Sequence, residues 1–124
     1  MTPTVKYKKL DPRAVVPTYA TPGAAAADLC ALLDAPLTLA PMQRTLVPTG
    51  LAIELPDAGC VALVYARSEL RVPMVNLSNE PYTIQPGERV AQLCIAPVWQ
   101  ATFTAADALS DTDRGAGGFG STGK

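Results

Sequence analysis

Hydrophobic and polar residues alternate along several short stretches of this 124-residue chain. From Leu51 to Leu55 every second residue is a large aliphatic one, which is the period-2 pattern of a half-buried strand. Residues 5–10 alternate in part and predict an edge strand whose lysines face water. Short apolar runs predict further strands at residues 37–39, 44–47, 60–66, 72–77, 82–84 and 90–98. The continuous run at residues 60–66 is expected to be the most buried of these strands.

Twelve prolines, about twice the usual share of ~5%, are spread along the chain. Because a proline inside a helix removes a backbone hydrogen bond and clashes with the preceding turn, this spacing forbids long helices. Turns are predicted at Pro56–Gly59 and Gln85–Glu88. The pattern Thr, aliphatic, any, Pro, any, Gln or Glu, Arg occurs at residues 38–44 and again at 83–89. It predicts two similar strand–turn–strand corners in an all-β sandwich or jelly roll.

The composition narrows the class of protein. The length supports one domain, and 48% hydrophobic against 17% charged residues is enough to bury a core. A net charge of -1 provides no basic footprint for nucleic acid. The N-terminus has no apolar signal core and no apolar run approaches a membrane span, so a cytoplasmic protein is expected. Cys30, Cys60 and Cys94 are far apart and are interpreted as small buried thiols.

The chain contains no histidine. A Ser-His-Asp triad, a Cys-His pair and imidazole metal ligands are therefore excluded. General acid or base catalysis would fall to carboxylates, lysine or tyrosine, or to a metal-bound water.

Residues 114–124 are rich in glycine and predict an arm that is mobile until a ligand orders it, separate from a β domain at residues 1–113. The arm contains the first part of a P-loop pattern, Gly-x-x-x-x-Gly-Lys, but no Ser/Thr or helix follows it, so a P-loop is rejected. Its glycine amides, together with Arg114 and two hydroxyl residues, are still suited to phosphate. Phe119 is suited to stacking on a nucleobase. The alternative is a terminus without a function.

Several segments, in this order along the chain, resemble motifs of the trimeric dUTPases, which hydrolyse dUTP to dUMP and pyrophosphate. They are Ala20–Leu29 for the first motif, Ala66–Leu70 for the second, Pro86–Gln92 for the fourth and Arg114–Gly123 for the last, with further familial segments at 48–53 and 76–81. The resemblance implies a small β jelly roll that assembles as a homotrimer. It places each site between subunits, with the arm of one subunit closing over it.

The resemblance also implies roles for individual residues. Asp28 would organise the waters around a Mg²⁺ ion that the triphosphate carries. The phosphate chain of dUTP would be held by Arg67, Ser68, Gln92, Arg114, Gly120, Ser121 and Thr122, and the uracil would be covered by Phe119. In the family a carboxylate deprotonates the water that attacks the α-phosphorus, and this chemistry needs no histidine.

The sequence departs from the family at one place above all. The family's third motif, which carries the catalytic aspartate and the hairpin that recognises uracil, is absent, and no Asp-x-x-Tyr occurs in the chain. Leu70 is followed directly by Arg71, so some two dozen residues are missing, which is room for about two or three strands. Glu69 stands where the family has glycine, and its carboxylate is expected to repel phosphates. Ala26 replaces a common glycine, a milder change.

Three functions follow as hypotheses. The first is a dUTP diphosphatase that uses Mg²⁺, with no catalytic carboxylate identified. The second is a catalytically inactive relative that binds a nucleotide or a protein partner. The third is a deaminase of the same fold family acting on dCTP, which ranks last because the glycine-rich arm favours dUTPase.

Overall fold

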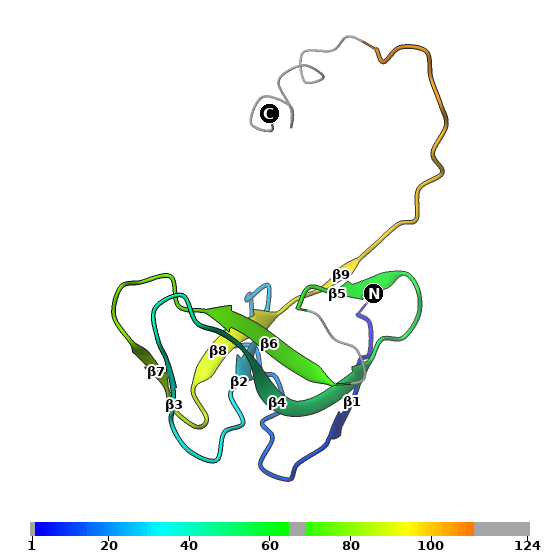
Figure 1. The fold of residues 1–124 in the computed structure, drawn as a ribbon. Helices are drawn as coiled ribbons and strands as arrows, with labels where there is room; N and C mark the ends of the chain where they lie inside the picture. The colour runs from blue at the N-terminus through cyan, green and yellow to red at the C-terminus, as the bar shows by residue number, and fades with distance from the viewer. Residues whose placement is uncertain (1, 65–68, 111–124) are drawn as a thin grey trace.

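The described residues, 2–64 and 69–110, form nine strands and no helix in the computed structural model (Figure 1). The strands are β1 (Lys6–Lys9), β2 (Ala27–Cys30), β3 (Leu37–Leu39), β4 (Arg44–Glu54), β5 (Cys60–Ala62), β6 (Leu70–Val75), β7 (Tyr82–Ile84), β8 (Arg89–Leu93) and β9 (Ile95–Pro97). One sheet has the order β1-β4-β6, and the other strands form the pairs β2–β8, β3–β7 and β5–β9. All pairings are antiparallel. The prediction of an all-β fold is confirmed.

One core joins these strands. Its largest fully buried side chains come from five of them, namely Leu29, Leu39, Leu51, Leu70 and Ile84. Because these five strands and β8 each contribute one or two buried residues to the same cluster, they share a single apolar interior. No helix of the described residues is long and apolar enough to cross a membrane.

Most predicted strands are found close to their expected bounds. The lysine-rich edge strand is β1, which is exposed throughout and pairs with β4 only. The two segments expected at 44–47 and 51–55 are one strand, β4, and the segment expected at 90–98 is divided into β8 and β9. In the turn between β4 and β5, Asp57 Oδ1 accepts a hydrogen bond from the backbone N–H of Gly59 at 2.7 Å, as predicted. The three cysteines are half-buried free thiols.

The expectation that residues 60–66 form the most buried strand is wrong. Only β5 forms there in the described part of the chain, its residues are half-buried, and Leu63 is 61% exposed. The reason is that β5 lies at one end of the molecule, where only Ala62 of its three residues packs against the core (Figure 1). Val47 and Leu51 in β4 are fully buried instead, because both belong to the central core cluster.

A bulge bends β4 where it crosses the core. Pro48 is paired with Arg71 and Leu51 with Leu70, so Thr49 and Gly50 have no partner in the ladder. The buried hydroxyl of Thr49 donates a hydrogen bond to the carbonyl oxygen of Leu70 at 2.6 Å. Gly50 has a φ of 72°, in the left-handed region that favours glycine.

The internal repeat corresponds to a structural repeat. The first copy forms β3, a turn and the start of β4, and the second forms β7, a turn and the start of β8. The two copies pair with each other, with Thr38 opposite Thr83 and their hydroxyl oxygens 2.9 Å apart. The prediction of two similar corners is therefore confirmed.

The same side-chain contact closes both turns. The backbone N–H of Ala40 donates to Gln43 Oε1 at 2.8 Å, and that of Gln85 donates to Glu88 Oε1 at 2.9 Å. The Gln85 N–H, and after it the Tyr82 hydroxyl, hold the pKa of Glu88 below its ordinary value. The Gln or Glu of the repeat is thus a turn-closing acceptor.

The two corners also dock in the same way. Met42 N–H, with φ 66°, donates to the carbonyl of Asn76 at 2.6 Å, and Gly87 N–H, with φ 82°, donates to that of Ala31 at 2.9 Å. Each corner therefore extends the ladder of a strand on its own side of the molecule, one beyond β6 and one beyond β2.

Replacing Gly50 by alanine tests the bulge in β4. A Cβ there would lie 2.6 Å from Leu32 Cδ2 and 3.0 Å from Ala14 Cβ, whereas a Cβ at Gly87 meets nothing within 4 Å. Both glycines have positive φ, so Gly87→Ala should cost about 1–2 kcal/mol for backbone strain alone. Gly50→Ala should cost roughly 2–4 kcal/mol, because overpacking is added. Urea denaturation measures both, and equal losses would show that the contacts at Gly50 do not matter.

Candidate functional site

The structure brings together two of the residues to which the sequence assigns a role, Asp28 on β2 and Gln92 on β8. They are directly opposite each other in the antiparallel ladder. Gln92 Nε2 donates a hydrogen bond to Asp28 Oδ1 at 3.3 Å. Both side chains point away from the core because their neighbours Leu29 and Leu93 point into it.

A third polar side chain, which the sequence analysis did not single out, joins this pair. Arg89, the first residue of β8, places Nη1 3.4 Å from Asp28 Oδ2. Each carboxylate oxygen of Asp28 therefore has its own donor. The sequence contained a signal for Arg89, because this residue ends the second repeat and lies inside the segment that resembles the fourth motif.

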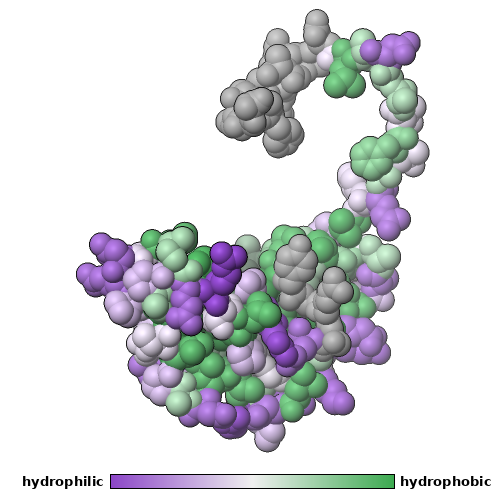
Figure 2. Space-filling model, viewed as in Figure 1, coloured by the Kyte–Doolittle hydropathy of each residue, from purple (hydrophilic) through white to green (hydrophobic). Residues whose placement is uncertain are grey.

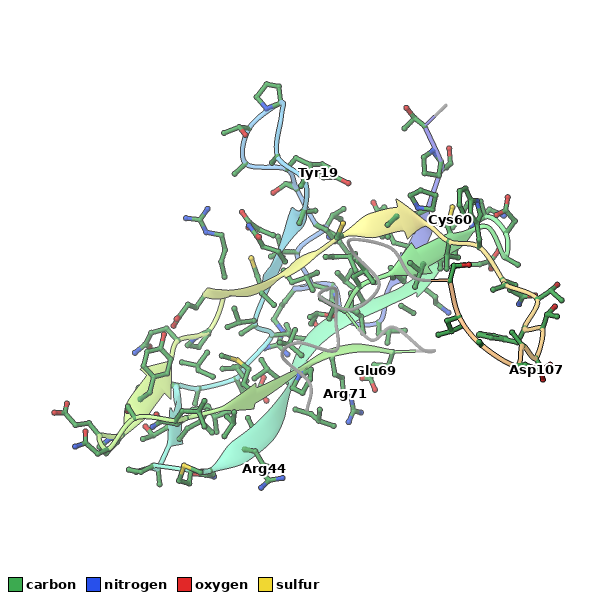
Figure 3. The ribbon with its side chains drawn as sticks, turned by 90° about the horizontal axis from the view of Figure 1, so that it is seen from above. Tyr19, Arg44, Cys60, Glu69, Arg71 and Asp107 are labelled. Carbon is green, nitrogen blue, oxygen red and sulfur yellow. The ribbon has the colours of Figure 1, made fainter. Side chains whose placement is uncertain are left out.

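Asp28 is held more firmly than the side chains that contact it. Its side chain is 14% exposed, against 71% for Arg89. Its backbone N–H donates to the carbonyl of Thr18 at 2.8 Å, which ties β2 to the loop before it. Tyr19 follows on that loop and is exposed (Figure 3). The carboxylate is thus a fixed, nearly buried anion beside two movable donors.

The donor set fits a magnesium ion bound mainly by a substrate. The described residues contain no group of three or more His, Cys, Asp or Glu side chains that could hold a metal by themselves. Mg²⁺ commonly keeps several waters and is bound by one or two carboxylates plus substrate phosphates. The oriented carboxylate of Asp28 could provide the protein's part of such a site, and this role stays a prediction.

The negative charge of Glu69 is compensated by a neighbouring cation, Arg71. Arg71 donates to Glu69 Oε2 through Nε at 2.9 Å and through Nη2 at 2.5 Å. Both side chains extend from the start of β6 (Figure 3). The carboxylate that the sequence predicted to repel phosphates is therefore neutralised locally.

The remaining predicted residues lie outside the described residues, and their roles stay predictions. They are Arg67, Ser68, Arg114, Phe119, Gly120, Ser121 and Thr122.

A hollow of the described surface lies elsewhere and is apolar. It has a volume of about 600 Å³ and is lined from β4, β6 and the adjoining loops by residues that include Met42, Leu46, Val75 and Leu77. These four side chains are between 45% and 75% exposed. Figure 2 shows apolar side chains on the face over β4 and β6, between polar ones. With no ionisable group except Arg44, this hollow is suited to packing against a protein surface and not to phosphate chemistry.

Comparisons with known proteins place the chain in one family. A family model described as dUTPase matches residues 13–73 and 69–123. The deoxyuridine 5'-triphosphate nucleotidohydrolase of Aeromonas hydrophila is 45% identical over 151 aligned positions, which cover 100% of this chain and 99% of that protein. The enzyme of the same name from Desulfitobacterium hafniense is 42% identical, with 96% of this chain and 94% of that protein covered.

Solved structures of low sequence identity share the fold. A dUTPase of Staphylococcus bacteriophage 80alpha with dUpNHpp has a TM-score of 0.77 at 22% identity, covering 98% of this chain and 99% of that one. A dUTPase from phage phi11 of S. aureus, described with a structural Mg(II) ion, has a TM-score of 0.66 at 17% identity, covering 87% and 99%. The all-β architecture is thus the dUTPase fold. With relatives above 40% identity along its whole length, the chain belongs to the dUTPase family.

Proposed function

We propose that this chain hydrolyses dUTP to dUMP and pyrophosphate in the presence of Mg²⁺, more slowly than a dUTPase that has the third motif. The observation that carries the proposal is the pairing of Asp28 with Gln92, in a chain whose relatives are named for this reaction. The bound dUpNHpp and the Mg(II) ion described for two phage enzymes of the same fold support the same substrate and ion.

Asp28 and Gln92 of the β2–β8 pair would have different roles at the triphosphate. Asp28 would hold waters of the magnesium ion, which neutralises charge on the phosphates when bound. Gln92 Nε2 donates to Asp28 in the free protein and can donate to a phosphate oxygen once the nucleotide arrives. The predicted contributions of Arg67, Ser68 and the C-terminal arm would complete the phosphate contacts.

None of the three candidate carboxylates, Asp28, Glu69 and Asp57, is a free acceptor for the proton of the attacking water. Asp28 is engaged by Arg89 and Gln92, Glu69 is engaged by Arg71, and Asp57 closes a surface turn. Loss of a general base typically lowers a rate by about 10²–10⁴-fold. Hydrolysis would then proceed by positioning and charge stabilisation, with bulk water taking the proton.

The comparisons support the prediction that the third motif is missing. The family model matches in two pieces that overlap at residues 69–73, at the start of β6. The alignment with the Aeromonas enzyme has 151 positions for the 124 residues of this chain, so more than two dozen positions of that enzyme have no counterpart here. Where the two matched pieces overlap, β6 begins at Leu70, which is fully buried and paired with Leu51 of β4.

A homotrimer in the cytoplasm remains part of the proposal. The exposed apolar side chains over β4 and β6 support assembly, because burying them in an interface would remove apolar surface from water. Segment 98–110 leads away from the strands, with Trp99 91% and Phe103 94% exposed (Figure 1).

The second candidate function is nucleotide binding without turnover. The absence of an Asp-x-x-Tyr segment from the sequence favours it. It uses the same phosphate-binding residues and differs only in the rate of the chemical step.

Pyrophosphate release from dUTP with Mg²⁺ separates the two candidates. We expect slow release that Asp28→Asn abolishes, because the amide cannot hold magnesium-bound waters as a carboxylate does. A variant with a family-type third motif inserted after Leu70 should be faster by about 10²–10⁴-fold. Release no faster than that of Asp28→Asn, with calorimetric binding of dUpNHpp intact, would reject hydrolysis and support nucleotide binding alone.

Arg71→Gln tests the neutralisation of Glu69. Without its countercharge the carboxylate should repel the triphosphate and weaken the affinity for dUpNHpp about fivefold, near the ~1 kcal/mol upper range for exposed ion pairs. The double variant Glu69→Gln/Arg71→Gln should restore the affinity, since it has neither charge. Calorimetry measures all three proteins. If the double variant binds as weakly as Arg71→Gln, Arg71 acts on the nucleotide directly and the neutralising role is wrong.

A further inference from the structure

We propose that Arg89 is a positioning residue that orients Asp28 for the magnesium–nucleotide complex, and that a bulge at Val90 brings it to the site. The inference rests on the proposed function, because it assigns Asp28 to magnesium-bound water. It adds a residue to which neither the motifs nor the comparisons assign a role.

The bulge is visible in the pairing of β2 with β8. Leu29 is paired with Ala91, and the next residue, Cys30, is paired with Arg89, so Val90 has no partner. Val90 and Ala91 are consecutive and yet both pack against the core. In a regular strand consecutive side chains point to opposite faces. The extra residue therefore changes the alternation once, within the ladder.

The consequence concerns Arg89 and Gln92. Residues three apart on a regular strand lie on opposite faces, and one of these two would then point into the core. With Val90 inserted between them, both point outward and contact the same carboxylate, Asp28. The ladder continues beyond the bulge, where Ala31 N–H donates to the carbonyl of Glu88 at 2.8 Å, so the position of Arg89 is fixed from both sides.

The other corner of the structural repeat shows the arrangement without a bulge. There Arg44 is paired with Val75 and the ladder continues regularly through Thr45 and Leu46. Arg44 is exposed on β4 and forms no ion pair within the described residues (Figure 3). Two corners with the same turns and the same final arginine thus differ at the bulge, and the bulge occurs only in the corner that faces an aspartate.

The Arg89–Asp28 pair contributes little to folding. The guanidinium is 71% exposed and the contact is 3.4 Å long, and exposed ion pairs of this kind contribute about 0–1 kcal/mol. Its effect is on orientation, because Arg89 holds one oxygen of Asp28 while Gln92 holds the other. When Gln92 turns to a phosphate, Arg89 still fixes the rotation of the carboxylate. Groups that orient a metal-site carboxylate typically change affinity or activity by 10–100-fold when removed.

The experiment measures the affinity of the full chain for dUpNHpp by calorimetry, with and without Mg²⁺. Arg89→Gln should weaken the Mg²⁺-dependent affinity about 10–100-fold, leave the affinity without Mg²⁺ within a few-fold, and leave the midpoint of thermal unfolding unchanged. Arg89→Lys should retain part of the affinity, since it keeps the charge without the planar fork. Arg44→Gln, the equivalent change in the other corner, should have no effect.

The variant Asp28→Asn completes a double-mutant cycle. If Arg89 acts through Asp28, Arg89→Gln should cause no further loss in the Asp28→Asn background. An equal loss in both backgrounds, or an equal loss without Mg²⁺, would mean that Arg89 contacts the nucleotide itself and would overturn the positioning role. If Asp28→Asn leaves the Mg²⁺-dependent affinity unchanged, the proposed function fails at Asp28. If only Arg89→Gln has no effect, this inference alone fails.

Discussion

Side chains of a strand alternate between its two faces, and the candidate site depends on this constraint. Leu29 and Leu93 must point into the core, so their neighbours Asp28 and Gln92 must point out, and antiparallel pairing then sets them opposite each other. The same burial that stabilises β2 and β8 therefore aims their polar residues. Arg89 can join them only because Val90 breaks the alternation once. The site is a by-product of core packing together with one inserted residue.

The two corners of the structural repeat differ in the polarity of the strand that follows each turn. Both turns are closed by a Gln or Glu side chain, both dock onto a neighbouring strand, and β3 pairs with β7. Beyond the turns, the outward positions of β8 carry Arg89 and Gln92, whereas those of β4 carry Arg44 and Leu46. The first set faces Asp28, and the second lines the apolar hollow. A shared backbone framework thus supports a polar surface around Asp28 on one side and an apolar surface suited to protein contact on the other.

Local patterns in the sequence predicted those features whose causes are local. Alternation identified β1 and part of β4, and the residues Pro56–Gly59 predicted the turn that Asp57 closes, because period and turn chemistry depend on neighbouring residues. Burial of the run at residues 60–66 was misjudged, because it depends on where β5 lies relative to the core and not on the residues of the run itself. The bulge at Val90 was not foreseen either, since a valine in a strand has the same appearance whether paired or bulged. Asp28 and Gln92 were identified from family motifs. Their contact depends on the register of two strands and joins residues 64 apart in the chain, which no local pattern provides.

The position of the missing third motif explains why the phosphate side of the site can persist without it. The family model divides at residues 69–73, where β6 begins, and β6 is an edge strand of its sheet in the described residues. An edge strand tolerates Pro73. Leu70, at the start of β6, is fully buried and its carbonyl accepts a hydrogen bond from Thr49, so the beginning of this strand is fixed in the core. Asp28 and its two donors come from β2 and β8, whose pairing does not involve β6. In the proposed function, the phosphate contacts and the chemical step would be carried by separate parts of the fold, and the contacts of Asp28 and Gln92 would not depend on the part that is absent.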